Sequence, residues 1–216
     1  IKYFYFYVMK HNFIVILAAI NFFFINSCVR HETNEIKKTP NILIIFADDQ
    51  RADALGIAQN PYIKTPNIDD IAKNGVLFEN CYVMGGHHGA ICAPSRAMLL
   101  SGKSLFHVYD RLEEVETLPN YLSKNGFQTF ATGKWHNGAE SFETNFQEGS
   151  KVMLGGMSDH FNVPLRDLDE YNKLNNPRNE GFSTDIFAEA TLDYFDRYQA
   201  SKKEKPFFCY LAFTAP

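Results

Sequence analysis

One cysteine of this chain stands at the start of a segment whose residue types favour a short helix. The run from Cys92 to Gly102 reads CAPSRAMLLSG. Pro94 suits the first helical position, because its φ is already helical and its missing N–H would be unbonded there. Gly102 is expected to end the helix. A cysteine at a helix N-terminus meets free N–H groups that favour negative charge, and Arg96 adds a cation. A nucleophile is one interpretation, and a buried thiol or half of a disulfide is the other.

Two carboxylates follow a predicted strand. The residues from Asn41 to Ala47 form a short apolar run, rich in β-branched side chains, which predicts a buried parallel strand. Asp48 and Asp49 stand at its carboxyl end, where open α/β sheets place their ligand sites. Adjacent carboxylates at a strand end are more often caps or turn formers. As metal ligands, their hard oxygens would suit calcium or magnesium rather than zinc.

Two further segments contain predicted strands, and one of them is followed by a lysine and a histidine. Gly133-Lys134-Trp135-His136 directly follows the predicted strand Phe127 to Ala131. A single lysine or histidine at a strand end is usually solvated, so these two side chains alone predict little. The apolar run from Pro206 to Pro216 predicts another buried strand.

Together these segments resemble the type I sulfatases. Cys-x-Pro-Ser-Arg followed by Ala-x-Leu-Leu-Ser-Gly is similar to the signature of that family, whose cysteine is oxidised after translation to Cα-formylglycine. The other segments stand in the family's order, and the resemblance runs from about residue 39 to the end. It implies an α/β fold of the alkaline-phosphatase-like superfamily, a largely parallel sheet between helices. Residues 40–216 would be the N-terminal part of the catalytic domain, truncated at its C-terminus.

The resemblance also implies a nucleophile and a metal. Cys92, as formylglycine, would be the catalytic residue, and its hydrated aldehyde would attack sulfur. Asp48, Asp49 and the modified Cys92 would bind a divalent cation, usually Ca²⁺, with Mg²⁺ as the alternative. The other metal ligands, and a catalytic histidine after Ala-Pro, would lie beyond Pro216, so this polypeptide alone is expected to be inactive.

Three more residues take catalytic roles from the resemblance. Arg96 would orient the formylglycine hydroxyl and offset negative charge. Lys134 would face the sulfate, and His136 would hydrogen-bond the second hydroxyl of the hydrated aldehyde. Losing one such preorganised contact typically costs on the order of 10²–10³ in rate.

The implied function is a sulfuric ester hydrolase that releases sulfate from a sulfated glycan or a similar ester. Its partners would be the sulfated carbohydrate and a formylglycine-generating enzyme. Two alternatives remain open: a phosphate or phosphonate ester hydrolase of the same superfamily, and an inactive, truncated surface lipoprotein that binds glycan.

A histidine pair before the cysteine is a weaker candidate for substrate contact. His87 and His88 lie in a glycine-flanked loop, and no cysteine or acidic partner stands at metal-ligand spacing. A mobile loop at the rim of the pocket is the plainer interpretation. Arg111, with His107 and Asp110, follows the predicted motif helix and is a candidate for a sugar subsite.

The first forty residues predict export. Met9-Lys10-His11 resembles a start, thirteen mostly apolar residues follow, and Cys28 comes after a small residue, as in a bacterial lipobox. Residues 1–28 would be a lipoprotein signal and 29–39 a polar tether, with Cys28 lipidated. The enzyme would then be a periplasmic or outer-membrane lipoprotein held to the membrane by lipid. An uncleaved anchor helix is the alternative.

Composition excludes one class of partner. The net charge of −4 gives no basic surface for nucleic acid. Besides Cys28 and Cys92, the chain has Cys81 and Cys209, each in an apolar, strand-like run. Two free thiols are favoured over a disulfide, which an oxidising periplasm would also permit.

The remaining elements alternate as in an α/β domain. Helices are expected at 65–73, 117–124 and 183–200, with Leu192 on the apolar side of the last one. A strand is expected from Val76 to Val83. Residues 138–181 are rich in glycine, asparagine and charge, which indicates a long insertion or a substrate-facing loop.

Overall fold

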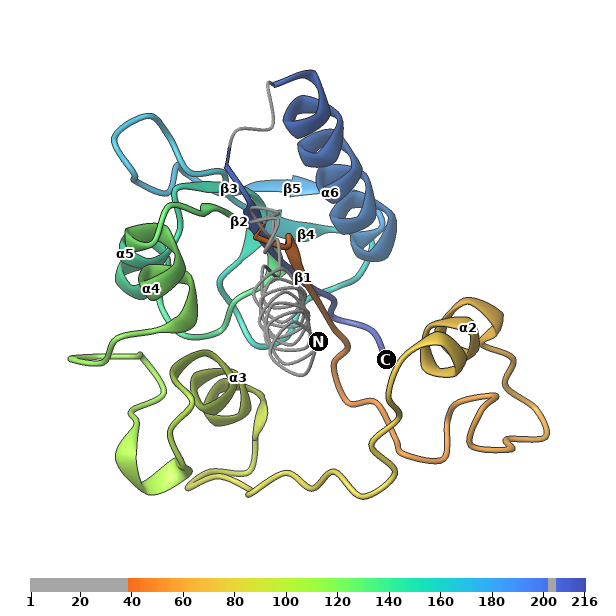
Figure 1. Ribbon diagram of the computed structural model, residues 1–216. Helices are drawn as coiled ribbons and strands as arrows, with labels where there is room; N and C mark the ends of the chain where they lie inside the picture. The colour runs from red at the N-terminus through yellow and green to blue at the C-terminus, as the bar shows by residue number, and fades with distance from the viewer. Residues whose placement is uncertain (1–38, 202–204) are drawn as a thin grey trace, which may run out of the picture. The chain divides into compact units, whose positions relative to one another are not determined.

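A computed structural model describes residues 39–201 and 205–216, and its main sheet consists of four parallel strands. Their order is β1 (Ile42–Phe46), β6 (Phe207–Ala212), β2 (Gln128–Lys134) and β3 (Glu148–Met153), as Figure 1 shows. Strand β6, the last in the chain, lies between β1 and β2, so the carboxyl ends of three strands from distant parts of the sequence meet at one edge of the sheet.

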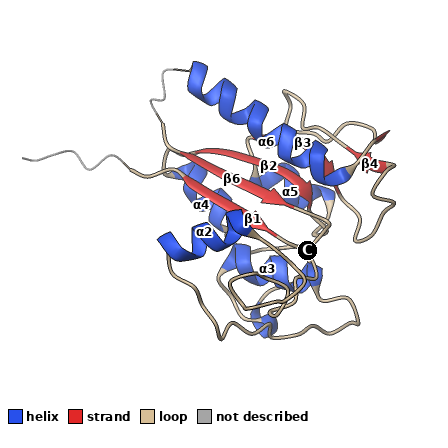
Figure 2. Cartoon of the chain, turned by 90° about the vertical axis from the view of Figure 1, so that its right-hand side faces the viewer, coloured by secondary structure: helices blue, strands red, loops and turns tan. Residues whose placement is uncertain are grey.

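Helices cover both faces of this sheet (Figure 2). On one face lies α6 (Ser183–Ala200), and on the other lie α3 (Cys92–Ser101), α4 (Leu118–Lys124) and α5 (Ala139–Asn145). Outside these layers are α2 (Pro66–Asn74), the short 3₁₀ helix η1 (Leu105–His107) and an antiparallel pair, β4 (Val163–Leu165) with β5 (Arg178–Glu180). The predicted α/β architecture is thus confirmed.

Strand β6 divides its side chains between the two faces, because successive strand residues point in opposite directions. Phe208 and Tyr210 pack on the side of α4 and α5. Cys209 packs against α6, where burial raises the pKa of its thiol to about 12 and keeps it protonated. Cys81 is exposed, and both cysteines are free thiols, the state that the sequence favoured.

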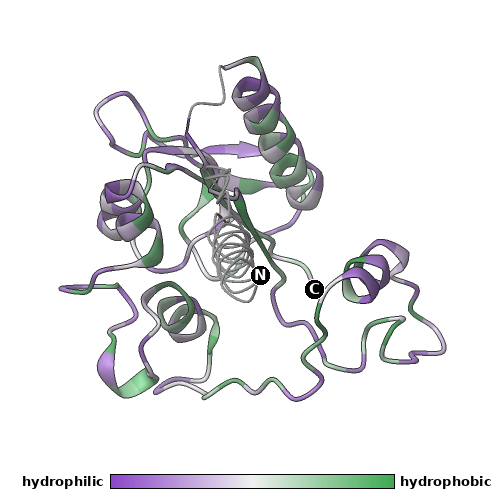
Figure 3. Cartoon of the chain, viewed as in Figure 1, coloured by the Kyte–Doolittle hydropathy of each residue, from purple (hydrophilic) through white to green (hydrophobic). Residues whose placement is uncertain are grey.

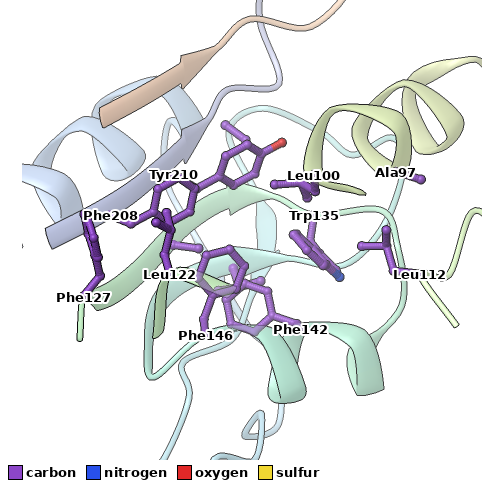
Figure 4. Packing of buried hydrophobic residues seen from close by; sticks show 13 residues of the cluster. Ala97, Leu100, Leu112, Leu122, Phe127, Trp135, Phe142, Phe146, Phe208 and Tyr210 are labelled. Atoms are coloured by element: carbon purple, nitrogen blue, oxygen red, sulfur yellow. The ribbon is translucent and has the colours of Figure 1, made fainter. Parts of the chain in front are cut away.

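Aromatic rings dominate the core between the sheet and α5 (Figure 4). Trp135 lies edge-on to Phe142, with ring centroids 5.4 Å apart and an interplanar angle of 87°. Its indole Nε1 donates to the Gly138 carbonyl at 2.8 Å and to Ser141 Oγ at 2.9 Å. These contacts fix the turn that follows β2, which carries His136 directly beyond Lys134, the last residue of the strand.

The helix that begins with the motif cysteine forms as predicted, with one difference. Gly102 ends α3 in the left-handed conformation, at φ 66°, and its N–H donates to the Met98 carbonyl. Pro94 is the third helical residue rather than the first, because the helix begins at Cys92. The N–H groups of the whole first turn lack helical partners, so proline is tolerated there as well.

Three sequence expectations are wrong. No strand forms at 76–83, and Val76, Phe78 and Tyr82 are exposed, because no described strand lies beside this segment to pair with it. Residues 138–181 are no simple loop, since they form α5, β3, β4 and β5. Leu192 is 60% exposed, because α6 turns its Ala190 and Tyr194 side toward the sheet.

Strand β1 is the edge of the sheet, and its apolar character is visible in Figure 3. Leu43 and Ile45 are 42% and 55% exposed, since α6 lies over β6 and β2 rather than over β1. Among the described residues, β1 has a strand neighbour on one side only, and a sheet edge of this kind can pair with a further strand.

Several predictions concern residues that the structure does not describe. The described residues do not include the predicted signal at 1–28, with its start at Met9 and its lipidated Cys28. They also do not include nearly all of the predicted tether at 29–39. Within residues 39–201 and 205–216, no helix is both long and apolar enough to cross a membrane.

Gly133 allows β2 to lie close to β6. Its φ is +91°, and a Cβ at this position would lie 1.9 Å from the carbonyl oxygen of Ala212. We expect Gly133→Ala to lower the free energy of unfolding by more than about 2 kcal/mol, since positive φ and a backbone clash add. The measurement is a urea midpoint, with Gly89→Ala as the control, because nothing lies within 4 Å of a Cβ there. Equal midpoints for the two variants would contradict this account.

Candidate active site at the carboxyl ends of the strands

The end of β1 places Asp48 beside the end of β6. The Phe213 N–H donates to the Phe46 carbonyl at 2.9 Å, and the Asp48 N–H donates to the Ala215 carbonyl at 3.1 Å. These bonds continue the pairing of the two strands beyond the sheet. Asp48 is 6% exposed as a result, and its carboxylate faces the interior of the site rather than solvent.

Two buried cations share the Asp48 carboxylate. Lys134 Nζ lies 2.5 Å from Asp48 Oδ2, and Arg96 Nη2 lies 3.0 Å from the same oxygen. All three side chains are at most 7% exposed. Buried charges are stable only when they are paired, and here two positive charges meet one negative charge. The cluster therefore has one uncompensated positive charge, which favours an anion next to it.

Arg96 is held in place by three further contacts. Its Nη1 donates to the Lys134 carbonyl at 2.6 Å and to the Tyr210 hydroxyl at 3.2 Å. Its guanidinium lies 5.0 Å from the centre of the Phe46 ring, in reach of a cation–π interaction. Among the described residues, Arg96 Nε is a buried donor without a partner. The described residues thus leave the hydrogen-bonding capacity of this N–H unused.

Cys92 stands one turn before Arg96 on the same helix, so both side chains lie on one face. It is the first residue of α3 and is half-buried, with a free thiol. The predicted position of the cysteine at a helix N-terminus is therefore what the structure shows.

His136 lies close to these charges and has a strained backbone, with φ at +65°. A Cβ on Gly156 would lie 2.4 Å from its Cε1 and Nε2, so only glycine lets the ring lie there. Burial, and then the charges of Lys134 and Arg96, lower the pKa of His136. The imidazole is thus neutral at neutral pH, and its buried Nδ1 lacks a partner within the described part of the chain.

The structure does not bring Asp49 into this cluster. Its φ is +53° and its side chain is exposed, without a hydrogen bond or ion pair to another described residue. In the described ranges 39–201 and 205–216, no group of three or more histidine, cysteine or acidic side chains is arranged to hold a metal ion.

The candidate rim residues lie elsewhere. His87 and His88 are exposed, and together with Arg111, His107 and Asp110 they line a cavity next to η1. The structure thus places the rim residues together in one cavity, whose lining includes neither Asp48 nor Lys134. None of them hydrogen-bonds to Asp48, Arg96 or Lys134 in the described part.

Sequence reasoning missed two residues that build the site. Asn137 is fully buried, and its Nδ2 donates to the carbonyls of Ala93 and Asp110, at 2.9 and 2.5 Å. Tyr210 supports Arg96 from the middle of β6. The position of Asn137 directly after the Gly133–His136 segment was an available signal, whereas no local pattern distinguishes Tyr210 from the other core aromatics.

Comparison with known proteins identifies the family and the fold of this chain. The family model described as Sulfatase matches residues 40–216. The N-acetylglucosamine-6-O-sulfatase of Bacteroides thetaiotaomicron is 29% identical over 93% of this chain and 34% of its own length. The N-acetylgalactosamine-6-sulfatase of Homo sapiens is 29% identical over 82% of this chain and 39% of its own. The chain therefore spans less than half the length of these curated relatives.

Solved structures give the same result. One determined with its substrate D-glucosamine-2-N,6-O-disulfate is 27% identical over 83% of this chain and 35% of its own, with a TM-score of 0.68. Another, in complex with k-i-k-neocarrahexaose, is 29% identical over 83% of this chain and 46% of its own, with a TM-score of 0.63. A member of the alkaline phosphatase superfamily from Vibrio parahaemolyticus shares the fold at a TM-score of 0.53. Because the family model matches residues 40–216, this chain belongs to the sulfatase family.

Proposed function

We propose that this chain carries active-site residues of a sulfuric ester hydrolase, which releases sulfate from a glycan with a formylglycine derived from Cys92 as nucleophile. The observation that carries the proposal is the buried cluster of Asp48, Arg96 and Lys134 at the carboxyl ends of the strands, next to a helix that begins with Cys92. A sulfatase needs an anion site and a nucleophile side by side; the cluster would supply the anion site, and position 92 the nucleophile.

The charges of the cluster suit a sulfate ester. Arg96 and Lys134 together exceed Asp48 by one positive charge, and a sulfate monoester has one negative charge. Because the two cations are held in a site that excludes water, they act strongly on charge that develops as the ester bond breaks. Lys134 and Arg96 would therefore bind the sulfate group and stabilise the transition state.

The first turn of α3 suits a nucleophile. A formylglycine at position 92 would supply a hydroxyl of its hydrated aldehyde for attack on sulfur. Arg96 stands one turn away on the same helix, and its unpartnered Nε would donate to that hydroxyl. The neutral His136 would accept a proton through its free ring nitrogen, since its lowered pKa keeps the base form populated at neutral pH.

Asp48 and Asp49 suit calcium or magnesium in the type of their donor atoms. Two carboxylates are fewer than the about six oxygens that calcium seeks, so further ligands would be needed. Lys134 now pairs with the Asp48 carboxylate, and it would be left for the sulfate if Asp48 held a cation. When bound, the cation would lower the pKa of the nucleophile and offset negative charge.

The substrate class comes from the relatives. Enzymes named for 6-sulfated N-acetylhexosamines and structures solved with sulfated saccharides are similar to this chain, and we propose sulfated carbohydrate as its substrate too. Such an enzyme would depend on a formylglycine-generating partner. The leader predicted around Cys28 would export it as a periplasmic or outer-membrane lipoprotein.

The test compares two esters of the same alcohol. The full-length protein is expressed in a host that makes formylglycine, and its rates on an aryl sulfate and on the matching aryl phosphate are measured with calcium present. We expect kcat/KM for the sulfate to exceed that for the phosphate by at least about tenfold. Faster hydrolysis of the phosphate would favour the phosphate or phosphonate hydrolase, and hydrolysis of neither ester, with Cys92 modified, would favour the inactive lipoprotein.

A further inference from the structure

A cavity of about 710 Å³ lies beside the first turn of α3, and its lining includes none of Asp48, Arg96 and Lys134. Its walls are the loop with His87 and His88 and the segment from Leu105 to Arg111, together with Glu113. Cavities that bind small molecules have volumes of about 300–1,000 Å³, so this one is large enough for a sugar unit. Neither the proposed sulfate site nor the proposed nucleophile uses this cavity.

Two contacts place the cavity next to Cys92. The side chain of Asn137 donates to the carbonyl of Ala93, which directly follows Cys92, and to the carbonyl of Asp110 in the cavity wall. On the other side, a Cβ on Gly86 would lie 3.0 Å from Pro94 Cγ, so the histidine loop packs against the same turn. A ligand in the cavity would thus lie beside the nucleophile position, where the rest of a substrate must go.

The wall has the chemistry of a carbohydrate site. Phe106 and Tyr109 line the cavity and are 75% and 74% exposed, so the faces of both rings are accessible to a ligand. The ring of His87 lies edge-on to Phe106, with centroids 6.3 Å apart. An aromatic face stacks on the C–H face of a sugar ring, and polar side chains around it bond the hydroxyls.

Polar groups of both signs surround the two rings. Ser104 Oγ lies 2.9 Å from His107 Nδ1, which orients that imidazole, and Arg111 provides five N–H donors. Asp110 and Glu113 outnumber Arg111 by one negative charge when the histidines are counted as neutral. This balance disfavours a second sulfate and favours hydroxyl groups.

We propose that this cavity is a subsite for the sugar ring linked to the sulfated unit, and that Phe106 and Tyr109 are its stacking platform. The inference rests on the proposed function, because it needs a sulfated glycan at Cys92. It extends that function by predicting a preference for oligosaccharides over single sulfated sugars and aryl esters.

The test uses Phe106→Ala and Tyr109→Ala in the full-length protein, with Tyr62→Ala as the control, since Tyr62 is 91% exposed and lies outside the cavity. Probes are an aryl sulfate, N-acetylglucosamine-6-sulfate, N-acetylgalactosamine-6-sulfate and oligosaccharides that end in each of these two sugars, together with carrageenan oligosaccharides. We expect wild type to prefer an oligosaccharide to the small esters by at least about tenfold in kcat/KM. Each cavity variant should lose most of this preference and stay within about twofold of wild type on the small esters.

Two results would overturn the subsite without touching the proposed function. One is sulfate release by wild type with no preference for any oligosaccharide. The other is an equal loss on all esters in the cavity variants, with lowered thermal midpoints, which would mean that the rings pack against protein. If wild type releases sulfate from none of the probes, the proposed function fails and the subsite fails with it.

Discussion

Cys92→Ala is expected to abolish sulfate release, with a loss on the order of 10⁴-fold or more, because it removes the proposed nucleophile. The fold should be kept, since Cys92 is a half-buried first residue of α3 and alanine favours a helix. The measurement is kcat/KM on an aryl sulfate together with the thermal midpoint of each protein. Cys92→Ser should be equally inactive in a host whose maturation enzyme accepts only cysteine.

A second cysteine provides the matched control. Cys81 is a free, exposed thiol, and Cys81→Ala should retain wild-type activity. If Cys92→Ala also keeps a substantial part of the activity while Cys81→Ala is normal, the nucleophile must be another residue. An equal loss in both variants would indicate a general effect of thiol removal rather than chemistry at Cys92.

Asp48→Asn is expected to have the second-largest effect, and it should act on both catalysis and stability. The variant leaves Arg96 and Lys134 buried without their carboxylate, and removing one partner of a buried ion pair costs about 3–5 kcal/mol. It also removes a proposed calcium ligand, so the rate on an aryl sulfate should fall by at least about 10²-fold. Urea unfolding, calcium titration and kcat measure these effects separately.

Asp53→Asn is the control for the loss of one carboxylate. Asp53 pairs with Arg51 at the surface, with both side chains more than half exposed, and such pairs contribute little to stability. We expect its unfolding midpoint and activity to match wild type. An Asp48→Asn protein that unfolds earlier but keeps full kcat and calcium binding when folded would show that Asp48 only stabilises the fold.

The sequence predicted the main elements where local patterns and packing agree. The strand after Asn41, the helix that Gly102 ends and the long helix from Ser183 all form near their expected bounds. The strand expected at Val76–Val83 does not, because β propensity without a neighbouring strand gives no hydrogen-bonded ladder. Strand β3 was missed because glutamate, glycine, serine and lysine occupy four of its six positions.

The candidate site was predictable where its residues belong to contiguous segments. Asp48, Arg96 and Lys134 come from three such segments, and the structure joins them through one carboxylate oxygen. Pairing of this kind depends on the strand order, in which β6 lies between β1 and β2, and no local pattern encodes that order. For the same reason the role of Tyr210 could not be predicted, since its contact with Arg96 spans 114 residues of sequence.

The most direct test is the mass of the peptide that contains Cys92, measured on purified full-length protein alongside its rate of sulfate release. We predict that active preparations contain the peptide with the thiol replaced by an aldehyde, and that the rate rises in proportion to the converted fraction. Coexpression with a formylglycine-generating enzyme should raise both together. Full sulfatase activity in a preparation whose Cys92 is entirely unmodified would contradict the account.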